Sequence, residues 1–365
     1  MMRQQDSSGR KQPIRPATSA LRPDGIPYRS LHKQKGVTFE ELRHADGLRV
    51  LPGAPKGVVE VSPAYFVPGS DCLYDKAGQR VPESCVRRGR DLGELVNGGM
   101  ESIKLPTQYA EINQPSLFLG SVPNHWGHFL TEGISRLWPL RRFSELRGCQ
   151  MVYLGPPRHI NVINHFLRFA DIDTGRLVPL QQAVRITTCF VPLPSFANRG
   201  LAYTVHSQLP GLVATKVLCN ELPVMSERPV YLSRTLWKPD HARVLRGEEA
   251  LVSMLSRQGA VIAHPQRLSL REQIMLLNCH KTFIGCWGSA FHSLILRCCH
   301  SRAETHVICQ EANRNGILFD ALLQTNATYV QALHPTPDAV QSWPQLDLQI
   351  DTPLVIRYLH QKRII

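Results

Sequence analysis

The chain has 365 residues, of which 43% are hydrophobic and 19% charged, so it is long and apolar enough to form two domains with cores of their own. Its net charge of +13 indicates anionic partners such as nucleic acid, phosphorylated small molecules or an acidic membrane surface. No apolar run is long enough to span a bilayer, and the N-terminus lacks the apolar stretch of a signal peptide, so we expect neither a membrane-spanning nor a secreted protein.

Residues 1–35 are rich in Arg, Lys, Pro, Ser and Gln and predict a disordered basic arm. This arm could contact anionic lipid headgroups or serve only to keep the protein soluble. From Gly57 the pattern becomes that of strands, because VVEVSPAYFV alternates and LYDKAGQRV contains a turn at Lys76–Gly78. We expect a loop over Asp91–Ser116.

The stretch Phe118–Leu140 begins with turn residues and then takes the period of a helix, which we predict over Trp126–Leu146. His128, Glu132 and Arg136 are spaced four apart and would form a polar stripe on that helix. A proton-transfer group, a carboxylate and a cation beside a glycine-containing loop indicate a catalytic wall. A solvated helix face with a Glu132–Arg136 ion pair would show the same spacing.

The elements that follow alternate between strand and helix and predict an α/β layer with a largely parallel sheet. They are a strand over Gln150–Leu154, a helix over His159–Ala170, and strands over Arg176–Pro179 and Val184–Val191. We expect a loop over Pro192–Pro210.

The second half predicts a doubly wound domain of five strands separated by four helices. The strands are Pro229–Ser233, Ala260–Ala263, Lys281–Gly285, His306–Gln310 and Ala327–Leu333, and the helices Gly247–Gln258, Ser269–Cys279, Ser289–Cys299 and Ile317–Gln324. Ser269 and Glu272 have the spacing of a capping box. A last helix over Thr352–His360 is expected to pack back onto the first domain.

Two features of this second half predict an anion site. In KTFIGCWGSAFHSLIL, Gly285 and Gly288 allow a tight turn, and Ser289 could cap a helix whose N–H groups favour a diphosphate. The turn is neither a GxGxxG fingerprint nor a Walker loop, which disfavours a NAD enzyme or a P-loop NTPase. An ordinary βα turn that needs small residues would look the same.

The second feature is a cationic loop: Arg234 ends the first strand of the domain, and Lys238 and Arg243 follow it. Ligands of open α/β sheets bind at the carboxyl ends of the strands, where three cations suit phosphate. A surface loop of a basic protein is the alternative. No metal site is expected, because Cys298-Cys299-His300 cannot all face one ion and the ten cysteines suit reduced, buried thiols.

Four stretches in order carry a resemblance to a known family: NHWGHFLTEGISRLW, then VYLSR with Arg243 and Glu248-Glu249, then PQRLSLREQIMLL, then FIGCWGSAFHSLIL. Together they resemble glycosyltransferase family 61, which contains bacterial transferases of the capsular-polysaccharide type and plant and animal xylosyl- and N-acetylglucosaminyltransferases. The resemblance implies a GT-B-like α/β architecture of two Rossmann-like domains facing across a cleft. It also implies inverting, metal-independent transfer, with the nucleotide-sugar held by the second domain.

The resemblance assigns residues by position. The acceptor-side helix is matched by Gly127, His128 and Glu132, with Asn124 and Arg136 in the same stretch, and the donor side by Arg234, Gln273, Gly288 and Ser289. Two positions depart from the family. Trp287 stands where the family usually has histidine, and Ser293 where it usually has asparagine. Trp287 could replace a histidine only by stacking, and the nearby His292 is either a substitute for it or a packed core residue.

We therefore predict a hexosyl- or pentosyltransferase of polysaccharide or capsule biosynthesis that transfers a sugar from a nucleoside diphosphate to a hydroxyl of a glycan or lipid-linked saccharide. Glu132, or His128 in its place, is the expected base, and Arg234, Arg243 and the Gly288–Ser289 turn stabilise the leaving diphosphate. The nucleotide-sugar is the donor substrate, and no cofactor is expected.

The predicted domains are an acceptor-side domain over 36–215, a nucleotide-sugar-binding domain over 216–335 and an extension over 336–365. We expect a cytoplasmic protein, with peripheral contact with an anionic inner membrane face left open. A catalytically silent homologue that binds glycan or nucleotide is the alternative. A nucleic-acid-binding protein is disfavoured, because the sequence carries no motif of that class.

Overall fold

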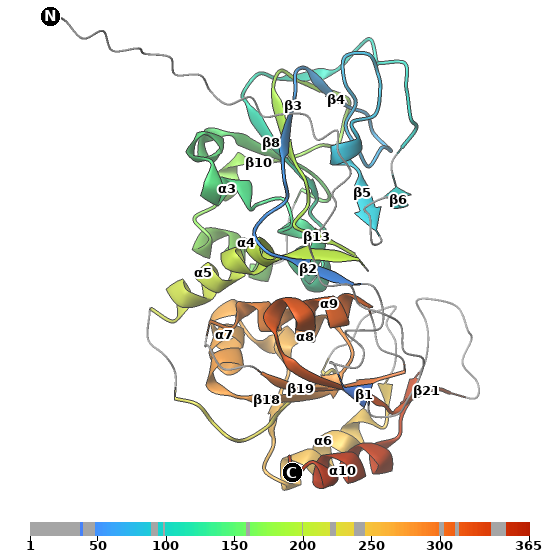
Figure 1. Cartoon of the computed structure of the whole chain (residues 1–365), viewed down its shortest axis with the longest axis vertical. Coiled ribbons are helices and arrows are strands. Elements are labelled where there is room, and N and C mark those ends of the chain that lie inside the picture. Colours follow the sequence, from blue (N-terminus) through green and yellow to red (C-terminus); the bar gives the residue numbers. More distant parts are fainter. Residues whose placement is uncertain are drawn as a thin grey trace, which may run out of the picture.

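The computed structural model describes residues 37–38, 48–88, 94–97, 99–157, 161–198, 200–219, 224–236, 245–298, 303–310, 314–336 and 348–365. The predicted basic arm, Lys238 and Arg243 lie outside the described residues. Within those ranges no helix is both long and apolar enough to cross a bilayer. The chain is a mixed α/β protein, and its two largest sheets lie in the two halves seen in Figure 1.

The lower sheet in Figure 1 has six strands. Their order is β1 (Val37–Thr38), β20 (Asn326–Gln331), β19 (Glu304–Cys309), β18 (Thr282–Cys286), β15 (Val230–Leu232) and β17 (Val261–Ala263). All neighbours are parallel except β1 and β20. In chain order the parallel strands follow the 2-1-3-4-5 pattern of a doubly wound sheet, so the winding reverses between β15 and β18.

The upper sheet has five strands and a similar reversal. Their order is β10 (Leu177–Pro179), β9 (Gln150–Leu154), β8 (Ser116–Ser121), β12 (Cys189–Pro192) and β3 (Val58–Val61). Only β3 is antiparallel to its neighbour. From β8 the chain builds β9 and β10 on one side and then returns to add β12 on the other. The reversal therefore lies between β8 and β12.

Smaller sheets and the helices complete the described fold. The sheets are β4 (Ala64–Phe66), β11 (Val184–Ile186) and β7 (Ala110–Ile112); β13 (Phe196–Ala197), β14 (Leu201–Tyr203) and β2 (Arg49–Leu51); β16 (Leu245–Arg246), β22 (Leu348–Ile350) and β21 (Leu333–Pro335); and β5 (Val86–Arg88) with β6 (Glu94–Asn97). The α-helices are α2 (Trp126–His128), α3 (Pro139–Arg142), α4 (Asn161–Phe169), α5 (Gln208–Val217), α6 (Glu248–Arg257), α7 (Leu270–Cys279), α8 (Ser289–His292), α9 (Arg314–Leu323) and α10 (Thr352–Gln361). Short 3₁₀ segments are η1 (Pro82–Ser84), η3 (Ser144–Gly148), η4 (Thr174–Arg176), η5 (Thr204–Ser207), η6 (Pro265–Arg267) and η7 (Ser293–Leu296), and η2 (Phe129–Gly133) is a π-helical turn.

One large hydrophobic cluster runs through both halves. It joins buried residues near the five-stranded sheet, such as Leu119 and Phe129, to Phe283, Leu294 and Phe319 of the other half. Helix α5 contacts α4 of the first half and both α7 and η7 of the second half. The two large sheets are therefore linked through a common apolar core.

Most elements of the second half agree with the sequence-based prediction. The capping box at the start of α7 is confirmed, because Ser269 Oγ accepts from Glu272 N at 3.2 Å and Glu272 Oε2 accepts from Ser269 N at 2.7 Å. The apolar runs in β18 and β19 are buried, as expected for central parallel strands. The predicted helix Ser289–Cys299 is shorter and continues as the 3₁₀ segment η7.

The final helix was assigned to the wrong half. Helix α10 packs against α6, and its residues Val355 and Leu359 join a cluster with Leu251, Ile284 and Val330 of the six-stranded half. Helix α6 offers an apolar face beside the strands that immediately precede α10. This face explains why α10 packs there.

The predicted helix over Trp126–Leu146 is also wrong. The structure has α2, the π turn η2, a turn, α3 and η3 instead of one helix. Pro139 lacks a backbone N–H and starts a new helical turn, so a continuous helix cannot pass through it. Ser135 Oγ adds a competing hydrogen bond to the Glu132 carbonyl at 2.6 Å.

Several strands of the first half were merged or missed. The predicted strand over Val184–Val191 is two strands, β11 and β12, which belong to different sheets, and VVEVSPAYFV likewise divides into β3 and β4. The expected loop over Asp91–Ser116 contains β6 and β7, and that over Pro192–Pro210 contains β13, β14 and η5. Each of these strands has only two to four residues, too few for a periodic signal.

Candidate active site

Two of the stretches singled out in the sequence touch each other in the fold. The turn around α2 follows β8, and α8 follows β18, so each begins beside the point where its sheet reverses its winding. A Cβ built on Gly127 would lie 2.5 Å from Ser289 Cβ, which requires a glycine here. The Trp126 indole Nε1 donates to Ser293 Oγ at 2.8 Å. Crevices at such reversal points are where open α/β sheets bind ligands.

Glu132 is the centre of a hydrogen-bonded group on the α2–η2 turn. Its carboxylate lies 3.2 Å from His128 Nδ1 and accepts from Thr131 Oγ1 and Asn198 Nδ2. The Glu132 side chain is 22% exposed, whereas the His128 side chain is 61% exposed. The pair therefore has a sheltered carboxylate and an imidazole that faces solvent.

The pKa of Glu132 is lowered although the side chain is largely buried. Burial does raise this pKa and is the largest single influence. The hydrogen bonds from His128, Thr131 and Asn198 and the charge of His128 together outweigh it, and the pKa lies below its ordinary value. Glu132 is therefore ionised at neutral pH.

An ionised Glu132 fixes the orientation of the His128 ring. When Nδ1–H of His128 donates to the carboxylate, the neutral ring carries its lone pair on Nε2. This is the arrangement by which a carboxylate holds the correct tautomer of a general base.

The His125 ring lies 5.0 Å from the His128 ring and its Nδ1 is 3.4 Å from the His128 backbone N.

The segment that carries Asn198 is held against the same turn by His206. His206 Nε2 lies 2.9 Å from the Leu130 carbonyl and Nδ1 lies 2.9 Å from Ser195 Oγ. Burial lowers the pKa of His206 to about 4, so its neutral ring donates from Nε2 to Leu130. This buried Ser–His pair therefore positions the backbone beside Glu132.

Arg136 does not belong to a polar stripe with His128 and Glu132, and that prediction is wrong. The Arg136 side chain is buried and donates to the backbone carbonyls of Pro192 and Cys85. Its Nε lies 3.0 Å from a Cβ built on Gly120, which has φ +72° in β8. Because the helix is interrupted after η2, the spacing of four no longer places Arg136 on the side of Glu132.

On the other sheet, Arg234 follows β15 at the winding reversal, directly beside the strand that leads to Trp287. Its backbone N donates to Glu248 Oε1 at 2.7 Å, and Tyr231 OH donates to the same oxygen at 3.2 Å. Burial raises the pKa of Glu248, although these donors and the Arg234 charge act in the opposite direction. Glu248 thus fixes the loop that carries Arg234.

The Gly288–Ser289 turn differs in one detail from the prediction. Gly288 occupies the N-cap position with extended backbone, and Ser289 is the first residue of α8, so Ser289 does not cap the helix. The Trp287 backbone N donates to the Ile308 carbonyl at 2.8 Å, and its indole packs where a side chain on Gly316 would lie.

Comparison with known protein families finds a match that covers these turns. The family model described as Glycosyltransferase 61 matches residues 126–308, which begin in α2 and end in β19. The chain belongs to glycosyltransferase family 61. No curated protein matches the chain. The matched segment contains both the Glu132 group and the Arg234 and Gly288–Ser289 positions of this glycosyltransferase.

The structure also describes Gln273 and Asn124, two further residues that the resemblance assigned. The Gln273 side chain is buried and its Nε2 donates to the carbonyls of Pro265 at 3.2 Å and Leu268 at 3.1 Å. These bonds hold the η6 turn that precedes α7. Asn124 is exposed on the turn before α2. Arg243 lies outside the described residues.

Two residues beside Glu132 were not identified from the sequence as functional. Thr131 is adjacent to Glu132 and carried no pattern of its own. Asn198 lies 66 residues away in a segment expected to be a loop, so no local signal could have found it.

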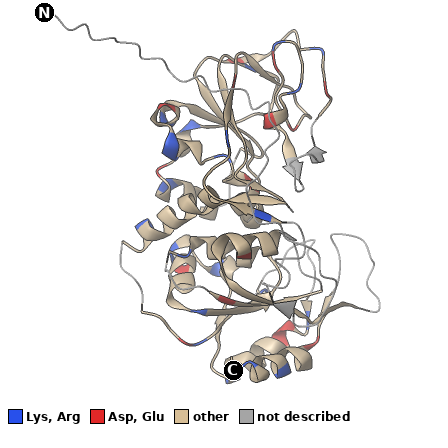
Figure 2. Ribbon diagram, viewed as in Figure 1, with Lys and Arg blue, Asp and Glu red and all other residues tan. Residues whose placement is uncertain are grey.

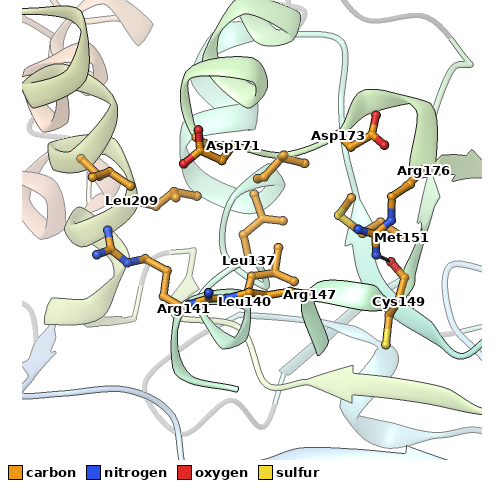
Figure 3. Close-up of a pocket in the computed structure, with 13 residues that line it drawn as sticks. Leu137, Leu140, Arg141, Arg147, Cys149, Met151, Asp171, Asp173, Arg176 and Leu209 are labelled. Atoms are coloured by element: carbon orange, nitrogen blue, oxygen red, sulfur yellow. Dashed lines mark hydrogen bonds between the residues drawn. The ribbon is translucent and has the colours of Figure 1, made fainter. Parts of the chain in front are cut away.

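A separate pocket of the glycosyltransferase has a volume of about 310 Å³ (Figure 3). It is lined by Leu137, Leu140, Arg141, Arg147, Cys149, Met151, Ala170, Asp171, Ile172, Asp173, Arg176, Leu209 and Leu212. None of the assigned site residues lines it. Among the described residues no group of three or more His, Cys, Asp or Glu side chains is arranged to hold a metal ion.

Proposed function

We propose that this family 61 glycosyltransferase transfers a hexosyl or pentosyl group, with inversion, from a nucleoside diphosphate sugar to a hydroxyl of a glycan or lipid-linked saccharide. The observation that carries the proposal is the direct contact between the turn bearing His128 and Glu132 and the turn bearing Gly288 and Ser289. A proton acceptor and a phosphate-binding turn must lie close together for such a transfer. Product analysis by NMR of the new anomeric linkage tests the inversion.

A GT-B-like organisation accommodates this chemistry. In that organisation residues 36–215 form the acceptor-side domain, 216–335 the nucleotide-sugar domain and 336–365 an extension. Two mostly parallel sheets, each with a winding reversal whose loops contact the other, support it. Helix α10 packs on α6, which supports grouping the extension with residues 216–335 rather than with the first domain.

His128 is the favoured general base and Glu132 the residue that orients it. Glu132 has a lowered pKa and is surrounded by donors, so it binds a proton weakly. The exposed His128 can take the proton of the acceptor hydroxyl on Nε2 while Nδ1–H remains on the carboxylate. The ionised Glu132 then stabilises the imidazolium that forms.

The leaving diphosphate is assigned to the other turn. Arg234 supplies a guanidinium at the carboxyl end of β15, and the backbone at Gly288 and Ser289 supplies N–H groups at the neighbouring strand. Arg243 is expected to add a further cation.

Replacement of Arg234 tests the phosphate assignment. Arg234→Ala should weaken binding of UDP, GDP, CDP or dTDP, whichever the parent protein binds, by about 10-fold or more, because a charge-assisted contact is lost. Isothermal titration calorimetry measures the change. The matched control is Arg228→Ala, since Arg228 precedes the same strand at its opposite end and donates to Gly259 O at 2.8 Å. Equal affinities of Arg234→Ala and the parent would remove Arg234 from the phosphate site.

Metal independence gives a second test. If cations and backbone N–H groups stabilise the diphosphate, turnover should persist in excess EDTA within about two-fold of the untreated rate. Initial rates measured with and without chelator decide this. Loss of turnover that Mn²⁺ or Mg²⁺ restores would show that the leaving-group chemistry is wrongly assigned.

A catalytically silent homologue that binds nucleotide or glycan is the second candidate. It is favoured by Trp287, which replaces the family histidine and packs against Gly316 of α9. Nucleotide binding without transfer or hydrolysis over a panel of nucleotide-sugars would support this candidate over the enzyme.

The cellular setting is also a proposal. A role in polysaccharide or capsule biosynthesis on the cytoplasmic side, with peripheral contact with anionic lipid, agrees with the net charge of +13. Figure 2 shows Lys and Arg in both halves of the described fold, so charge alone singles out no docking surface. Co-sedimentation with anionic and neutral vesicles tests the membrane contact.

A further inference from the structure

His292 lies at the contact between the two turns and is almost completely enclosed. Its side chain is on α8, and the residue is 9% exposed. The ring stacks on Phe319 with a centroid distance of 4.6 Å and meets the Trp287 ring edge-on at 5.7 Å. On its other side, Nδ1 lies 3.4 Å from a Cβ built on Gly127. The imidazole is thus enclosed by aromatic rings and by the α2 turn.

Among the residues that the structure describes, neither ring nitrogen of His292 has a hydrogen-bond partner. The Gly127 backbone is near enough to favour the protonated ring, but among the described residues it makes no hydrogen bond with it. Buried polar atoms without partners are rare and costly, and a phenyl ring would fill the same aromatic enclosure without that cost. Packing alone therefore does not account for an imidazole at this position.

A second unpartnered atom lies beside the same group of residues. Asn198 donates from Nδ2 to Glu132, but its Oδ1 is buried and accepts no hydrogen bond from the described part of the chain. Asn198 contacts the α2–η2 turn at Glu132 and His292 contacts it at Gly127, so both side chains lie against one turn. Together they present an N–H donor, a ring acceptor and a carbonyl acceptor that no described residue satisfies.

The protonation state of His292 indicates what would satisfy it. Burial lowers its pKa to about 4, with smaller opposing influences from Glu132 and Gly127. The ring is therefore neutral near pH 7 and offers one donor and one acceptor. A hydroxyl group can either donate or accept, so separate hydroxyls of one sugar match the donor and the acceptor of this ring and the acceptor Asn198 Oδ1. A phosphate offers only acceptors at neutral pH.

We propose that His292 and Asn198 bind hydroxyl groups of the transferred sugar, which sits between the α2 turn and α8. The inference deepens the proposed function and rests on it. Because Gly127 contacts Ser289 and Trp126 donates to Ser293, the proposal requires this turn to separate from α8 for the sugar to reach His292. His292 is thus a sugar-binding residue rather than a substitute for the phosphate contact of the family histidine.

The test compares sugar binding, diphosphate binding and stability in one variant. His292→Phe preserves the stacking on Phe319 and removes both nitrogens. We expect the melting temperature to be unchanged or higher, because a buried group without partners is removed. Affinity for the nucleotide-sugar that the parent binds best, chosen from UDP-, GDP-, CDP- and dTDP-sugars, should fall about 10-fold. Affinity for the matching nucleoside diphosphate should stay within about two-fold of the parent value.

The other outcomes are equally decisive. Unchanged affinity for the nucleotide-sugar would make His292 a core residue, and equal losses for sugar and diphosphate would make it a phosphate ligand. Should His292→Phe fail to fold, His292→Gln and His292→Leu form a matched pair, since only Gln retains a donor and an acceptor. We expect His292→Gln to bind the nucleotide-sugar more tightly than His292→Leu does. The two variants should have equal affinities for the nucleoside diphosphate. If the parent binds no member of the panel, the proposed function fails as well, whereas normal binding by all variants overturns only this inference.

Discussion

His128→Ala should slow sugar transfer by about 10²- to 10⁴-fold, the range typical for loss of a positioned general base. The affinity for nucleoside diphosphate should hardly change, because the diphosphate is assigned to the other turn. Single-turnover rates with saturating donor, together with calorimetric affinities, separate these two effects. The matched control is His125→Ala, which removes a neighbouring imidazole whose ring lies 5.0 Å from that of His128 and which makes no hydrogen bond to Glu132 among the described residues.

Glu132→Gln should reduce transfer by at least about 10²-fold, although it preserves size. A neutral amide no longer favours the Nδ1–H tautomer of His128 or stabilises its imidazolium. If Glu132→Gln abolished transfer while His128→Ala retained it, the carboxylate would be the base. Near-parental turnover in both variants would mean that the pair is an ordinary solvated group on the α2–η2 turn.

Gly127→Ala should lower both stability and transfer. Its new methyl group would lie 2.5 Å from Ser289 Cβ, so α2 and α8 must separate. We expect a loss of about 1–3 kcal/mol in the free energy of unfolding, which is typical of overpacking, and slower transfer because the two turns are displaced. Chemical denaturation and initial rates measure the two effects.

Gly211→Ala is the matched control for Gly127→Ala. Gly211 lies within helix α5, and a Cβ there would meet nothing within 4 Å. This substitution should raise the free energy of unfolding by about 0.5–1 kcal/mol, since alanine favours a helix over glycine. If Gly127→Ala raised the free energy of unfolding by the same amount and kept full activity, the close contact between α2 and α8 would have no role in function.

The second half of the fold was predictable because its signals are local. Long apolar strands alternate with capped helices, and the capping box of Ser269 and Glu272 can be read from four consecutive residues. The first half was less predictable, because its strands are short and the helical period around Glu132 passes through a proline. The sequence around Glu132 therefore has the periodicity of a helix, although the structure has no continuous helix there.

The candidate site was likewise predictable only in part. The resemblance identified His128, Glu132, Arg234 and the Gly288–Ser289 turn, and the fold brings the first two into hydrogen-bond range. The hydrogen bonds from His128 and Thr131 that lower the Glu132 pKa are local, whereas the smaller contribution of Asn198, 66 residues away, could not be foreseen. The burial of Arg136 depends likewise on the carbonyls of Pro192 and Cys85, which only the folded chain places beside it.

The common apolar core has a consequence for engineering donor specificity. Exchanging the nucleotide-sugar half for that of a relative by cutting near residue 215 would divide α5, whose buried residues Val213, Ala214 and Val217 belong to the cluster that joins both halves. The cut would expose apolar surface on both fragments, and a foreign half would meet a helix face shaped for α7 and η7. A chimaera therefore requires the whole of α5 to be inherited together with the surfaces it covers, so that the crossover lies beyond residue 217.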